Sequence, residues 1–154
     1  MSRQQSRLEE ALAAFRAGEP VLIHDSADRE GETDVVYPAE AVTPGDVARL
    51  RNDAGGLLFV ALPDEIADAF GLPFLEETLD HPATADHELA YDDRSSFSLT
   101  VNHRETFTGI TDRDRALTVT ELAAAADAAA HGHDDTPEAF AERFRSPGHV
   151  HVLR

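Results

Sequence analysis

The residues with the clearest chemical potential lie in an acidic segment near the N-terminus, Asp28-Arg-Glu-Gly-Glu-Thr-Asp34. Four of its seven positions are acidic, whereas the average of the chain, 30 acids in 154 residues, would place only about 1.4 there. In an extended segment, Glu30, Glu32 and Asp34 would project from one edge. Such an edge could bind Mg²⁺ through one or two carboxylates, with water and a phosphorylated substrate completing the octahedron, while Arg29 contacts a substrate oxygen. A solvated acidic hairpin loop is the alternative.

A second candidate segment is Phe107-Thr108-Gly109-Ile110-Thr111, which precedes a short helical turn predicted at residues 112–115. Hydroxyl groups and backbone N–H groups at the start of a helix suit the oxygens of a phosphate or a sugar. Thr108 is therefore a candidate substrate-binding residue. Simple capping of the helix by the Thr hydroxyls is the alternative interpretation.

The third candidate is His149, which follows a Pro-Gly turn at the entrance of the last predicted strand. An imidazole in such a place can act as an acid or a base near neutral pH. His149 and His151 would share one face of the strand, so a His-x-His metal site is also conceivable. Against these interpretations stands an ordinary structural or surface role, which is common for histidine.

The composition excludes several classes of protein. Thirteen basic residues against thirty acidic ones give a net charge of −17, which disfavours nucleic acids and anionic membranes as partners. The absence of Lys excludes Schiff-base chemistry, and the absence of Cys excludes disulfides, thiolate nucleophiles and iron–sulfur clusters. No signal peptide or membrane-spanning segment is apparent, so we expect a cytoplasmic protein, and the acidic, Lys-free surface suggests a salt-rich (halophilic) cytoplasm.

Hydrophobic periodicity and turn signals predict one α+β domain over residues 1–154, with helices flanking a mixed β-sheet. A capping-box pattern places one helix start at Thr118. The apolar run Leu57–Leu62 predicts a strand buried on both faces, and residues 76–94 a long loop. The expected helices cover residues 5–17, 44–52, 64–70, 118–130 and 137–143, and the expected strands cover 20–24, 35–37, 57–62, 95–101 and 150–153.

Three segments in this order resemble the 3,4-dihydroxy-2-butanone 4-phosphate synthases of riboflavin biosynthesis. They are the acidic segment with Pro38-Ala-Glu40 after it, Thr108-Gly-Ile-Thr with Asp114-Arg115, and Pro147-Gly-His-Val150. The resemblance runs from about Leu8 to Arg154. It implies a lyase that converts D-ribulose 5-phosphate to 3,4-dihydroxy-2-butanone 4-phosphate and formate with Mg²⁺ or Mn²⁺ and no organic cofactor.

The resemblance also assigns roles to individual residues. It implies that Arg29, Glu30 and Asp34 bind the substrate, that Glu30 is also a metal ligand and a catalytic residue, and that His149 is essential. It further implies a homodimer with its sites at the subunit boundary. If His149 and Glu30 share a site, we expect the imidazole within about 10 Å of the carboxylate, which leaves room for a metal ion and a small sugar phosphate.

The chain departs from the family pattern in three places. Gly31-Glu32-Thr33 replaces Asn-Glu-Gly, and Phe59 replaces a common Cys. The family also continues into a Gly-His-Thr-Glu motif with a second metal ligand, so residues 1–154 are expected to lack the C-terminal part of the domain and are not expected to be active alone. Two alternatives stay open: another Mg²⁺-dependent sugar-phosphate enzyme such as a phosphatase, and a non-catalytic truncated paralogue.

Overall fold

The structure, a computed structural model, describes residues 2–25, 31–84 and 89–154 and contains two separate β-sheets. One is an antiparallel pair of β1 (Val21–His24) and β2 (Thr33–Val36). The other has three strands in the order β3-β5-β4, with β5 parallel to β3 and antiparallel to β4. The expected α+β fold with a mixed sheet is therefore confirmed.

Side-chain hydrogen bonds cap the starts of four helices in the described residues. Ser2 and Gln5 form a capping box at the start of the first helix, and Thr43, Thr111 and Thr136 each cap a later helix through the side-chain hydroxyl. The helices are α1 (Arg3–Arg16), η1 (Ala39–Ala41), α2 (Pro44–Arg49), η2 (Leu50–Ala54), α3 (Asp64–Ala69), α4 (Leu75–Thr78), η3 (Pro82–Thr84), α5 (Asp112–Ala130) and α6 (Pro137–Arg143).

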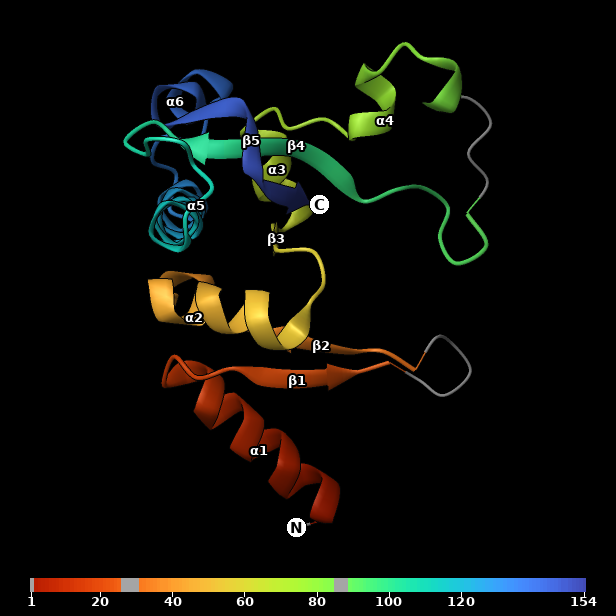
Figure 1. Cartoon of the computed structure of the whole chain (residues 1–154), viewed down its shortest axis with the longest axis vertical. Coiled ribbons are helices and arrows are strands. Elements are labelled where there is room, and N and C mark those ends of the chain that lie inside the picture. The colour runs from red at the N-terminus through yellow and green to blue at the C-terminus, as the bar shows by residue number, and fades with distance from the viewer. Residues whose placement is uncertain (1, 26–30, 85–88) are drawn as a thin grey trace.

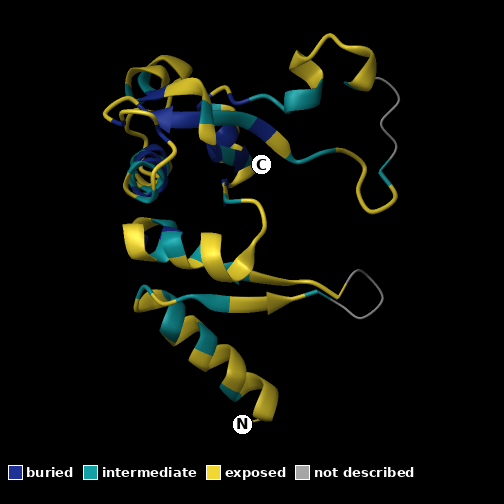
Figure 2. Cartoon of the chain, viewed as in Figure 1, coloured by how far each residue is buried: buried dark blue, intermediate teal, exposed yellow. Residues whose placement is uncertain are grey.

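The hydrophobic core lies between the three-stranded sheet and α5. Strands β3 (Phe59–Ala61), β4 (Phe97–His103) and β5 (Phe144–Leu153) form this sheet. Val150 and Val152 of β5 are completely buried, as is Leu122 of α5, and Figure 2 shows the buried residues gathered around these elements. Helix α5 also contacts α2 and η1, which connect the core to the β1–β2 hairpin and α1 in the other half of the molecule (Figure 1).

Two sequence predictions are wrong in detail. The apolar run Leu57–Leu62 is not buried on both faces: β3 is an edge strand in which only Val60 is buried, and Phe59 remains 44% exposed. The helix predicted to start at Thr118 starts at Asp112 instead. Thr118 is completely buried inside α5, where its hydroxyl accepts a hydrogen bond from the backbone N–H of His103 at 3.0 Å.

None of the helices in the described ranges combines the length and apolar character that a membrane span requires. The acidic residues are distributed over the surface, since no Asp or Glu that the structure describes is buried.

This surface makes stability dependent on salt. With a net charge of −17 and 30 acids to 13 bases, lowering monovalent salt from molar concentration to about 0.05 M lengthens the Debye length beyond about 10 Å and leaves the carboxylates repelling one another. We expect the melting temperature to fall by at least about 3 °C, the shift that about 1 kcal/mol produces in a domain of this size. NaCl and KCl should act alike at equal ionic strength. A melting temperature that stays constant would contradict adaptation to high salt.

Candidate functional site

A four-residue bulge, Ser146–His149, interrupts β5 and presents His149. Arg145 of β5 pairs with Asn102 of β4, and Val150 pairs with Val101. On β4 the two partners, Val101 and Asn102, are adjacent residues, whereas on β5 four additional residues lie between Arg145 and Val150. The predicted strand 150–153 is the part of β5 that follows this bulge, and β5 itself extends back to Phe144.

Side chains of β4 hold the bulge in place. The Ser146 hydroxyl donates to the backbone oxygen of Thr100 at 2.6 Å, and the backbone N–H of Gly148 donates to Oγ1 of Thr100 at 3.1 Å. The backbone N–H of His149 donates to Oδ1 of Asn102 at 2.8 Å. Side-chain groups of β4 therefore replace the backbone pairing that the bulge interrupts.

Gly148 is the position where the bulge approaches β4 most closely. A Cβ atom built on Gly148 would lie 2.0 Å from the carbonyl carbon of Val101 and 2.3 Å from the backbone N of Asn102. Both atoms belong to a buried backbone, which cannot move away as a flexible side chain could. Packing therefore requires glycine at the middle position of the Pro-Gly-His sequence, independently of any chemistry of the His.

The Thr108 turn lies next to this bulge and is fixed by the first turn of α5. Oδ2 of Asp114 accepts hydrogen bonds from the backbone N–H groups of Phe107 (3.2 Å) and Gly109 (2.9 Å). The Thr111 hydroxyl caps α5 by accepting from the N–H of Asp114 at 3.1 Å. The predicted helix start after Thr108 is confirmed, but it opens a 19-residue helix and not a short turn.

Thr108 itself is exposed, and its hydroxyl oxygen accepts a hydrogen bond from the N–H of Ile110 at 3.4 Å. This contact uses the oxygen as acceptor and leaves the hydroxyl hydrogen able to donate to a substrate oxygen. The geometry is compatible with capping and with substrate binding, so the role of Thr108 stays a prediction.

Asn102 joins the two segments. Its side chain is 3% exposed and lies between the bulge and the Thr108 turn. Nδ2 is 3.3 Å from Nδ1 of His149 and 3.4 Å from the backbone oxygen of Thr108. Gly109 leaves the necessary room, because its φ is +83° and a Cβ atom there would lie 2.2 Å from Nδ2 of Asn102.

The other predicted site residues are elsewhere in the chain. Arg29 and Glu30 fall outside the described residues, so the expected distance between Glu30 and His149 stays a prediction. Asp34 is exposed on β2, where it pairs with Ile23, in the half of the molecule opposite β5 (Figure 1). The hydrogen bonds of the described residues join Thr108 and His149 through Asn102, but none of them joins Asp34 to this group.

Metal coordination by the described residues is limited. Within residues 2–25, 31–84 and 89–154, no three His, Asp or Glu side chains lie close enough together to hold a metal ion. His149 and His151 have different surroundings, since the His151 ring contacts the Phe97 ring with centroids 5.8 Å apart. A metal ion bound by these residues would therefore need at least one further ligand, such as water or a residue outside the described ranges.

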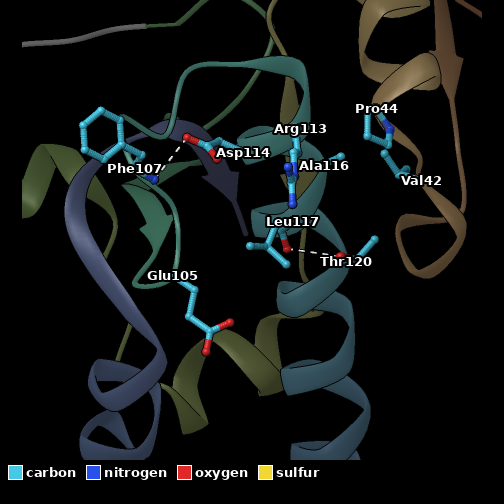
Figure 3. A pocket seen from close by; sticks show the side chains of 9 residues that line it. All are labelled: Val42, Pro44, Glu105, Phe107, Arg113, Asp114, Ala116, Leu117 and Thr120. Carbon is cyan, nitrogen blue, oxygen red and sulfur yellow. Dashed lines mark hydrogen bonds between the residues drawn. The ribbon is translucent and has the colours of Figure 1, made fainter.

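A pocket of about 440 Å³ lies on the other side of the Thr108 turn, between the start of α5 and residues 42–44 (Figure 3). Glu105 and Phe107 line it from the loop after β4, and Arg113 and Asp114 from α5. Thr108 and His149 are not among its lining residues. The candidate site is therefore the exposed surface of the bulge and not this pocket.

An ion pair fixes α5 relative to the preceding half of the chain. Arg51 donates from Nε and Nη2 to the two carboxylate oxygens of Asp112, at 3.1 and 3.0 Å. These hydrogen bonds hold the pKa of Asp112 below its ordinary value of 3.8. Because the pKa is lowered in the folded state, the pair contributes to stability above that ordinary value and ceases to do so as the pH falls through the lowered pKa.

Sequence analysis missed Asn102, which contacts both candidate segments. It directly follows the predicted strand 95–101 and continues the alternation of apolar and polar residues as one more polar position. The available signal was indirect. An amide side chain that is buried at the end of a strand needs hydrogen-bond partners, and such partners are found in neighbouring loops.

A comparison with known proteins adds family information to this geometry. A family model for 3,4-dihydroxy-2-butanone 4-phosphate synthase matches residues 9–154. Proteins of that name from Methanothermobacter thermautotrophicus and Archaeoglobus fulgidus are 44% and 49% identical to the chain, over 96% and 95% of its length. The chain spans only 65% and 64% of the length of these two relatives.

Solved structures give the same result. A crystal structure of a 3,4-dihydroxy-2-butanone 4-phosphate synthase in complex with two magnesium ions matches with a TM-score of 0.68 and 31% identity, over 96% of this chain and 59% of that one. A two-domain synthase from A. baumannii matches with a TM-score of 0.70 and 29% identity, over 95% of this chain and 37% of that one.

The sequence match covers the Thr108 turn, the Pro-Gly-His bulge and the acidic segment in one continuous alignment. The structural match covers the sheet and helices that position the first two of these segments. The chain therefore belongs to the 3,4-dihydroxy-2-butanone 4-phosphate synthase family.

Proposed function

We propose that this chain belongs to a lyase that converts D-ribulose 5-phosphate to 3,4-dihydroxy-2-butanone 4-phosphate and formate in riboflavin biosynthesis. The single observation that supports this most strongly is the joint positioning of His149 and Thr108 by Asn102, in a chain whose residues 9–154 match the family. Asn102 thereby connects the His149 imidazole to the turn that carries Thr108, the two residues to which we assign substrate contacts.

Each candidate residue has a distinct role in this proposal. His149 acts through its imidazole on a reacting oxygen of the sugar, as a group that donates hydrogen to it. The Thr108 hydroxyl donates to a phosphate or sugar oxygen. Arg29 binds an oxygen of the substrate through its guanidinium, and Asp34 accepts hydrogen bonds from substrate hydroxyls.

The proposed cofactor is a divalent cation, Mg²⁺ or Mn²⁺, with Glu30 as one ligand and no organic cofactor. A bound cation of this kind polarises the ketone and hydroxyl oxygens of a sugar phosphate and lowers the cost of removing the adjacent proton. The described residues do not complete a site for it, since no three potential ligands gather among them. The support for the cation is the relative solved with two magnesium ions.

We propose further that the protein acts as a homodimer in the cytoplasm. Asp34 and His149 lie in opposite halves of the chain (Figure 1), so a site that uses both can be formed between two subunits, with the hairpin from one and the bulge from the other. The net charge of −17 supports the absence of nucleic acid and anionic membrane partners.

The test is product analysis by mass spectrometry. The complete protein encoded by the gene is incubated with D-ribulose 5-phosphate and Mg²⁺, and we expect formate and a four-carbon dihydroxybutanone phosphate in equal amounts. A reaction with EDTA in place of Mg²⁺ is the control and should give neither product. Release of inorganic phosphate without formate would instead indicate a phosphatase, and the absence of any product would indicate a non-catalytic member of the family.

A further inference from the structure

The hydrogen bonds around Asn102 determine which way its side-chain amide faces. A backbone N–H can only donate and a backbone carbonyl can only accept. The N–H of His149, 2.8 Å away, therefore requires the oxygen Oδ1 on its side. The carbonyl of Thr108 requires the nitrogen Nδ2 on its side, at 3.4 Å. Both contacts thus require the same orientation of the amide. The oxygen and the nitrogen of an Asn side chain are often hard to tell apart, and here the two hydrogen-bond partners distinguish them.

This orientation in turn assigns the tautomer of His149. Nδ2 carries two hydrogens and no lone pair that can accept, and it lies 3.3 Å from Nδ1 of His149. With one hydrogen directed to Thr108, the second is available to His149. Nδ1 must accept this bond, so in the neutral imidazole the ring proton resides on Nε2.

We propose that Asn102 is a positioning residue that holds neutral His149 in its Nε2–H tautomer, so that His149 donates a hydrogen bond to the substrate through Nε2. In this state Nδ1 is occupied by Asn102 and Nε2 already bears hydrogen, so neutral His149 cannot serve as the base that removes the substrate proton. The base must then be another group. The catalytic part of this inference rests on the proposed function, whereas the tautomer does not.

Two neighbouring glycines leave the room that Asn102 needs for this contact. Gly109 and Gly148 approach Asn102 from two sides, and a side chain at either position would overlap the amide or the adjacent backbone. Asn102 is also paired in the strand ladder with Arg145, at the residue before the bulge. Gly109 thus closes one side of the amide, while Gly148 and Arg145 lie against the backbone of Asn102.

The experiment is ¹⁵N NMR of the imidazole ring, recorded without substrate at about pH 8.5, above the ordinary imidazole pKa of about 6.5. The two ring nitrogens show different shifts and couplings in each tautomer, and comparison with His149→Gln identifies the signals of His149. We expect the Nε2–H pattern in the parent protein. An Nδ1–H pattern, or an equal mixture of both tautomers, would overturn the proposal without the need for any variant.

Two variants separate positioning from structural support. Asn102→Asp replaces the donor by an acceptor of nearly the same shape, and we expect His149 to change to the Nδ1–H tautomer. Ser146→Ala removes a hydroxyl that anchors the same bulge to Thr100 without contacting His149 or Asn102, and it should keep the Nε2–H pattern. If both variants gave the same tautomer, Asn102 would be supporting the backbone only, and the proposal would fail.

Activity provides a separate measurement. In the complete protein, Asn102→Asp should lower kcat by at least about 10-fold with a smaller effect on KM, because loss of one hydrogen-bond donor to developing negative charge costs about 10²- to 10³-fold. A changed tautomer with unchanged kcat would refute the catalytic role of His149 that the proposed function assigns, while leaving the assignment of the tautomer by Asn102 supported.

Discussion

Replacing Glu30 by Gln is expected to reduce formate release from D-ribulose 5-phosphate by at least about 100-fold. Even groups that only orient a metal ligand change affinity or activity by about 10- to 100-fold, and loss of the ligand itself removes the charge that holds the cation. The free energy of unfolding should stay within about 1 kcal/mol, since Gln keeps the shape of Glu and a carboxylate in an acidic loop contributes little to stability. Formate assays and urea unfolding measure the two quantities.

The matched control is Glu142→Gln, the same substitution at an exposed position of α6. It should leave formate release unchanged. Magnesium titration adds a second criterion, because Glu30→Gln should require more Mg²⁺ for half-maximal activity. Near-normal formate release by Glu30→Gln at low Mg²⁺ would remove Glu30 from the site.

Replacing Gly148 by Ala is expected to destabilise the fold by about 3 kcal/mol, the upper end of the range of about 1–3 kcal/mol that overpacking typically costs, because the buried backbone at this site cannot yield. The added Cβ atom would lie 2.0 Å from the Val101 carbonyl carbon, and it can be accommodated only by separating β5 from β4 at their buried centre. The same movement displaces His149 from Asn102. Urea unfolding followed by circular dichroism measures the loss, and failure to fold would agree with the expectation.

Gly56→Ala is the control for this prediction. Gly56 is exposed and a Cβ atom there would meet nothing within 4 Å, so the unfolding free energy should change by no more than about 0.5 kcal/mol. A stability of Gly148→Ala equal to that of Gly56→Ala would mean that the bulge can move away from β4 without cost.

Local signals predicted most elements of the fold because each one depends on neighbouring residues. Pro at the first helical position marks the starts of the helices predicted at residues 44–52 and 137–143, and Thr43 and Thr136, which precede these prolines, cap α2 and α6 in the structure. Thr118 stands in a capping-box pattern without such a Pro, and it caps no helix. Its hydroxyl serves the distant N–H of His103, a tertiary contact that overrides the capping pattern and that neighbouring residues do not reveal.

The candidate site was predictable in its residue types but not in its connections. His149 and Thr108 stand out by sequence, yet the group that joins them is an amide on β4, separated from His149 by 47 positions. Its importance depends on the register of β4 against β5, including the bulge at residues 146–149, and register is set by tertiary packing. The exposure of Phe59 on β3 could not be predicted for the same reason. A Phe in an apolar run is expected in the core, and only the tertiary structure shows that it remains exposed.

The placement of β5 between β3 and β4 also has a consequence for the order in which the chain folds. The hairpin pairs Val21 with Val36, which are close in the sequence, so the segment between them closes rapidly. The three-stranded sheet instead pairs Phe59 with His151, 92 positions apart, and neither β3 nor β4 has a partner in this sheet until β5 arrives. During synthesis, β3 and β4 would therefore have unpaired edges until β5 has been made. In this interval aggregation competes with folding, and chaperones can protect the nascent chain.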